Sequence, residues 1–156
     1  MGSLMDLVAG ESQDILLALS VDDLDGLDDP ERFAAHLPLG GGLDPTWLDL
    51  FSEAVRNVTA GEEPADFLDA RSDLGAPNAG GERIVERVDP SWVEAVSRVR
   101  HDQLDALAGR WIDLLEEELG LLPREEKPWI RELTAHIVQF ARAADGARDV
   151  VFAWSF

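Results

Sequence analysis

Three Asp-Pro pairs, at residues 29–30, 44–45 and 89–90, divide this chain into short segments and constrain its fold more than any other feature. An Asp at the N-cap accepts hydrogen bonds from the free N–H groups of the first helical turn, and Pro in the next position already has the helical φ angle. Each pair therefore predicts the start of a helix. The helices predicted in this way cover residues 31–37, residues 45–58 with an end near Gly61, and residues 90–100.

Apolar residues at helical spacing predict further helices, and Gly residues mark their ends. One helix begins after Asp102 as its cap and ends at Gly120, and another covers residues 128–144 before the turn at Gly146. Shorter helices are predicted over residues 12–19 and from Pro64.

Two apolar segments predict strands, at residues 84–88 and 150–154. The second is apolar at successive positions, which is typical of a strand buried on both faces. Residues 3–9 fit either a strand or a short helix capped by Ser3. Together these patterns predict an α+β fold, a helix-rich single domain with five to seven helices and a small sheet that includes the C-terminal strand.

Two of the helix starts have nearly the same sequence, Leu43-Asp44-Pro45-Thr46-Trp47 and Val88-Asp89-Pro90-Ser91-Trp92. The first leads a helix that ends in Thr59-Ala60-Gly61, and the chain closes with a helix, the Gly146 turn and an apolar strand. Over residues 43–154 this arrangement resembles the YfbM-like family of uncharacterised bacterial proteins. The resemblance implies an α+β fold. It implies no catalytic residues, because that family has no established activity.

The length of 156 residues corresponds to one ordinary domain, and residues 72–82, rich in Gly, Pro and Asn, predict a flexible loop within it. The 13 Lys and Arg against 32 Asp and Glu give a net charge of −19. Such a charge repels membranes and nucleic acid and favours basic partners, so we expect neither membrane nor direct nucleic-acid binding. A GC-rich genome or a halophilic source also explains a chain with many acidic residues and a single Lys.

The absence of Cys, of an apolar signal segment and of a run of about 20 apolar residues predicts a cytoplasmic protein. The same absence of Cys removes thiolate nucleophiles and sulfur ligands for metals. The sequence also contains no metal-ligand motif, and no Lys or Arg flanks the Gly run at residues 40–42 to bind a phosphate, so we expect no cofactor.

The densest group of like charges comprises Asp22, Asp23, Asp25, Asp28 and Asp29. A calcium loop would have Gly at its sixth position, whereas Gly26 stands fourth from Asp23. The group is then either a solvated acidic loop or a docking surface for a basic partner. Trp92, near a helix start, is either a core residue or an aromatic anchor of the same interface.

Catalytic patterns are weak in this sequence. The three His residues form no His-Glu-x-x-His motif, and no Ser lies in a Gly-x-Ser-x-Gly turn. Glu132 and His136 are four residues apart on one predicted helix, so they form either a carboxylate–imidazole general base or an ordinary surface pair.

Charge and the lack of catalytic motifs favour a protein-binding module, such as an inhibitor or immunity protein that recognises a basic partner. The alternative is a small hydrolase or metal-assisted enzyme that uses Glu132, His136 and nearby carboxylates. A third possibility is a structural subunit of an oligomer. The sequence leaves the oligomeric state open.

Overall fold

The computed structural model describes residues 4–20, 25–40, 45–73 and 83–155. Helices, strands and two short 3₁₀ helices (η) follow in this order: β1 (Leu4–Gly10), α1 (Ser12–Ser20), η1 (Asp25–Asp28), β2 (Ala35–Gly40), α2 (Pro45–Thr59), β3 (Arg71–Asp73), β4 (Arg83–Val88), α3 (Pro90–Ser97), η2 (His101–Gln103), α4 (Leu104–Leu119), α5 (Glu126–Ala144) and β5 (Asp149–Ser155). These residues form a single α+β domain with five α-helices and one five-stranded sheet, and the C-terminal strand belongs to that sheet, as predicted.

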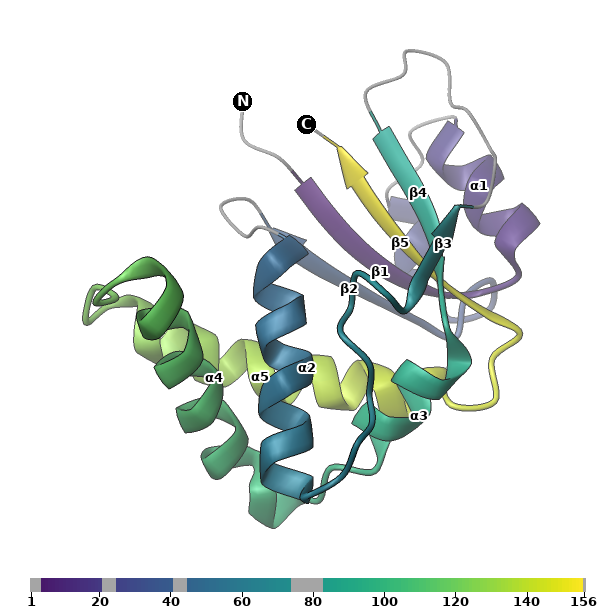
Figure 1. Ribbon diagram of the computed structural model, residues 1–156. Helices are drawn as coiled ribbons and strands as arrows, with labels where there is room; N and C mark the ends of the chain where they lie inside the picture. Colours follow the sequence, from purple (N-terminus) through teal and green to yellow (C-terminus); the bar gives the residue numbers. More distant parts are fainter. Residues whose placement is uncertain (1–3, 21–24, 41–44, 74–82, 156) are drawn as a thin grey trace.

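The sheet has the order β2-β1-β5-β4-β3, and every neighbouring pair is antiparallel. The last strand of the sequence, β5, therefore lies in the middle, between β1 and β4 (Figure 1). Residues 4–10 form a strand, which decides between the two structures that the sequence allowed. A strand suits them because alternate side chains enter two different cores, with Leu7 on one face and Val8 on the other.

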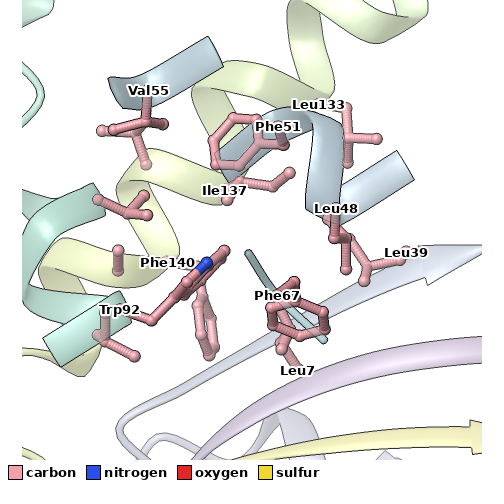
Figure 2. Packing of buried hydrophobic residues seen from close by; sticks show 14 of the residues in the cluster. Leu7, Leu39, Leu48, Phe51, Val55, Phe67, Trp92, Leu133, Ile137 and Phe140 are labelled. Atoms are coloured by element: carbon pink, nitrogen blue, oxygen red, sulfur yellow. The ribbon is translucent and has the colours of Figure 1, made fainter. Parts of the chain in front are cut away.

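Helices cover both faces of the sheet, but unequally. Helices α2, α3, α4 and α5 pack on one face, and α1 with η1 lies over the other (Figure 1). In the larger core the ring of Phe67 lies 5.0 Å from that of Trp92 and 5.1 Å from that of Phe152, measured between centroids. Figure 2 shows Trp92, Phe67 and Leu7 converging between the helices and the sheet. In the smaller core Ile15 and Leu27 pack in the cluster that contains Val8.

Most of the predicted helices are confirmed, as α1, α2, α4 and α5, and Gly120 and Gly146 follow α4 and α5 with φ angles of +90° and +86°. Helix α3 is shorter than predicted and ends at Ser97. Asp102 does not cap α4. The side chain of Gln103 accepts the N–H of Arg100, and the carboxylate of Asp102 instead pairs with the Arg100 guanidinium at 3.1 Å.

The predicted helix over residues 31–37 is wrong. Asp29 performs the cap chemistry, because its carboxylate accepts the N–H of Glu31 at 2.9 Å and its carbonyl accepts the N–H groups of Arg32 and Phe33. This makes a single turn, after which the chain becomes strand β2. Alternation decides the outcome, since Leu37 and Leu39 both pack on the larger core, and Pro38 between them is unsuited to a helix interior.

No helix begins at Pro64. Residues 67–70 form a turn, and side chains of α2 hold residues 64–70 in place. Arg56 donates to the carbonyl of Pro64 at 2.7 Å and pairs with Asp66 at 2.8 Å, while Asp49 accepts the N–H of Leu68. The predicted flexible loop over residues 72–82 is also too long, because Ser72 and Asp73 belong to β3; residues 74–82 lie outside the described part.

Candidate functional site

The charged residues of α1 and η1 are all acidic. Residues 1–31 contain no Lys or Arg and nine acidic residues, namely Asp6, Glu11, Asp14, Asp22, Asp23, Asp25, Asp28, Asp29 and Glu31. Asp14 on α1 and Asp28 at the end of η1 are exposed, and Asp25 begins η1. Glu11 is paired with Arg148 at 3.2 Å. Asp22 and Asp23 lie outside the described residues.

His36 on β2 joins this acidic layer to the sheet. Its Nε2 lies 2.8 Å from Oδ1 of Asp6 on β1, and its Nδ1 lies 2.7 Å from Oδ1 of Asp28. The side chain of His36 is 7% exposed, whereas that of Asp28 is 70% exposed. The imidazole therefore fixes η1 against the sheet, and Asp28 still presents much of its carboxylate to solvent.

The pKa of His36 lies above its ordinary value. Burial by itself lowers the pKa, because it disfavours the charged ring, but the hydrogen bonds to Asp6 and Asp28 and the charges of these carboxylates outweigh it. Only the cationic ring has two N–H groups and can donate to both partners. Since both ring nitrogens are engaged, neither is free to accept a proton from a substrate, and the cluster is suited to holding the acidic segment in place.

Of the five predicted acidic residues, the structure describes Asp25, Asp28 and Asp29. Asp28 and Asp29 make different contacts. Asp28 bonds to His36, and Asp29 is half-buried and forms the turn before β2. Trp92 is not an interface anchor. Its side chain is 1% exposed, and its Nε1 donates to Ser52 Oγ at 2.9 Å inside the larger core. The core alternative for this Trp is therefore correct.

Glu132 and His136 both lie on α5 and are exposed. No hydrogen bond or ion pair joins them in the described structure. His136 instead borders an open groove between α5 and the edge strand β2, together with Gln139 and residues 35–38. Of the two alternatives for Glu132 and His136, a general base and a surface pair, neither is formed. Across the described ranges, no group of three His, Asp or Glu side chains is placed to hold a metal ion.

A second acidic group surrounds the start of β3, where the sequence analysis named no site. Asp49 on α2 accepts the N–H of Leu68 at 2.7 Å. Burial raises the pKa of Asp49, and the nearby Asp66 and Asp69 act in the same direction, while the Leu68 hydrogen bond and Arg71 oppose them. Arg71 also pairs with Glu86 at 3.1 Å. Its hydrogen bonds and ion pairs hold residues 64–71 against α2 and β4.

Sequence reasoning did not find the cluster of Asp6, His36 and Asp28. Its members are 30 and 8 residues apart, and they meet only because β1 pairs with β2 and η1 packs beside them. The one signal available in the sequence is the alternation of residues 35–39, where His36 and Pro38 stand between the apolar Ala35, Leu37 and Leu39.

No family model matches the chain, and comparison with curated proteins and with solved structures gives no significant match. The resemblance to the YfbM-like family therefore stays a prediction. None of the described helices is both long and apolar enough to cross a bilayer.

Proposed function

We propose that this protein binds a basic protein partner through the acidic layer of residues 11–31, as an inhibitor or immunity-type module that masks the partner's nucleic-acid-binding surface. One observation carries the proposal. The first 31 residues contain nine carboxylates and no Lys or Arg, and three of these carboxylates, Asp14, Asp25 and Asp28, belong to α1 and η1, the layer that His36 fixes to the sheet.

Concentration of charge matters because salt screens isolated charges. Carboxylates spread evenly over a domain act weakly beyond the Debye length of about 8 Å at physiological salt, whereas a cluster produces a field that steers an oppositely charged partner. The exposed carboxylates of Asp14 and Asp28 belong to such a cluster. Fixing Asp28 in advance also lowers the entropy lost on binding.

The proposed compartment is the cytoplasm, in keeping with a chain that has no Cys. The hydrolase alternative is less well supported, because Glu132 and His136 do not contact each other and both nitrogens of His36 are engaged.

The test is capture of partners from a lysate of the source organism on the immobilised protein, with washes at low and then high salt and identification by mass spectrometry. A basic protein that leaves at high salt is the expected result. A variant with Asp22, Asp23 and Asp25 changed to Lys should lose this partner. The matched control, with Glu62, Asp105 and Asp113 changed to Lys, has the same change in net charge at exposed positions elsewhere and should retain it. Equal loss in both variants would contradict a role for the acidic layer.

A further inference from the structure

The hairpin formed by α4 and α5 exposes apolar side chains at its closed end. Leu119 at the end of α4 is 56% exposed, Leu121 in the connection is 91% exposed, and Trp129 in the second turn of α5 is 37% exposed. Isolated exposed apolar residues are ordinary, but three within eleven residues of one hairpin are a concentration of the kind found at interaction surfaces. We call Leu119, Leu121 and Trp129, with the neighbouring Glu117 and Glu118, the hairpin-end surface.

The connection that presents these side chains is held by specific contacts. Glu116 accepts the N–H of Leu122 at 3.1 Å through Oε2, and its Oε1 lies 3.7 Å from Nζ of Lys127. Trp129 packs edge-on against Trp47, with 6.3 Å between the ring centroids. These contacts hold the end of α4, the connection and the start of α5 together, so the exposed side chains have defined positions.

The charges beside these apolar residues are placed against the helix dipole. Glu117 and Glu118 lie in the last turn of α4, where the negative end of the dipole disfavours carboxylates, and the last turn contains no basic residue. Both are exposed, and within the described residues neither forms an ion pair. Of the nearby bases, Lys127 is engaged by Glu116, which leaves Arg124 as the exposed cation of the connection. This local arrangement lowers helix stability, and a cation placed beside the two carboxylates would offset that loss.

We propose that the hairpin-end surface docks a basic amphipathic helix of the partner, with apolar side chains against Leu119, Leu121 and Trp129 and Lys or Arg against Glu117 and Glu118. The inference rests on the proposed function, because it takes the partner to be basic. The negative charge of this surface favours a basic helix over a second copy of the chain or a membrane. A second copy would bring Glu117 and Glu118 against like charges on a chain of net charge −19, and the same charge opposes an anionic membrane.

Two synthetic peptides test the proposal by fluorescence anisotropy at physiological salt. The first is a 14-residue helix of Leu and Lys with Leu at helical spacing, and the second has Ser in place of every Leu. The wild-type protein should bind the first peptide more tightly than the second, and circular dichroism should show helix formation on binding. Changing both Leu119 and Leu121 to Ser should weaken binding of the first peptide by about tenfold or more.

Leu68→Ser is the matched control, because Leu68 is 63% exposed at a place outside the hairpin. It should change the affinity by less than about twofold, and thermal melts should show all variants folded. Equal affinity of the wild type and the double variant for the Leu/Lys peptide overturns the proposal, as does equal weakening in the control.

The two proposals fail separately. Suppose that binding of the Leu/Lys peptide falls when Asp22, Asp23 and Asp25 are changed to Lys but not when Leu119 and Leu121 are changed to Ser. In that case the acidic-layer function stands and the hairpin proposal fails. If neither peptide binds any form of the protein, the hairpin proposal fails, and partner capture from the lysate still decides the acidic-layer function.

Discussion

The imidazole of His36 is the residue on which the acidic layer depends. It is almost fully buried, and it contacts one carboxylate from β1 and one from η1. A buried cation with two anionic acceptors is stable only while it keeps its proton, because the neutral ring can donate to one partner alone. The attachment of η1 to the sheet is therefore sensitive to pH.

We expect His36→Asn to lower stability by about 2 kcal/mol near pH 6, since it removes charge-assisted hydrogen bonds. Because the folded-state pKa of His36 is raised above 6.5, its contribution is complete below pH 6.5 and is lost as the pH rises through the folded-state value. Urea unfolding from pH 5 to 9 should show wild-type stability falling toward that of the variant. The exposed His101 provides the control, and His101→Asn should leave the wild-type slope intact.

Ser52 is a second residue whose removal leaves a buried partner unpaired. Its hydroxyl donates to the carbonyl of Leu48 at 2.8 Å and accepts the indole N–H of Trp92. Ser52→Ala should cost about 1–3 kcal/mol, because the Trp92 N–H then has no acceptor inside the core. Chemical denaturation measures the loss. The double variant with Trp92→Phe should be less destabilised than the sum of the single changes, and strict additivity would contradict a coupled pair.

At the scale of the element, the Gly inside α4 and the Gly that follows it have opposite effects. Gly109 lies inside the helix, and apart from its chain neighbours and the helix's own backbone no heavy atom lies within 4 Å of an added Cβ. Gly109→Ala should raise stability by about 0.5–1 kcal/mol, because Ala is the better helix former. Gly120 has a φ of +90°, so Gly120→Ala should lower stability by about 1 kcal/mol although the space around it is also open. Thermal unfolding of both variants checks the signs.

Local signals predicted those elements in which the start and the following pattern agree. In the sequence, Asp44-Pro45 and Asp29-Pro30 are the same helix-start signal, but residues 45–59 continue with helical spacing and residues 35–40 alternate around Pro38. Helix α2 begins at Pro45, whereas the residues after Asp29 form a single turn. The helix predicted over residues 31–37 does not form, because the residues that follow the cap have the alternation of a strand.

Long-range pairing explains what the sequence did not reveal. Strand β3 is three residues long and becomes recognisable only through its pairing with β4. Likewise, the partners of His36 are fixed by the order of the strands, which no local pattern encodes. The acidic composition of η1 was predictable, whereas its attachment to the sheet was not.

At the scale of the whole molecule, the two faces of the sheet are unequally covered. The core under α2–α5 contains 29 buried apolar residues in the described structure, and the core under α1 and η1 contains nine. Less buried apolar area means less stabilisation, so the acidic layer should open without the rest of the domain. Hydrogen exchange should give amides in α1 a lower free energy of opening than those in α5. Equal values would show that the domain opens as one unit.

The central position of β5 also sets the order of events during synthesis. It joins two pairs, β2 with β1 and β4 with β3, that share no other strand. Translation proceeds from the N-terminus, so every other described element leaves the ribosome before β5 does. Until then β1 lacks the partner that will pair Leu7 with Phe152, and the two halves of the sheet stay apart. A stalled nascent chain exposing residues 1–148 should therefore be cut readily by protease, and one exposing residues 1–155 should resist.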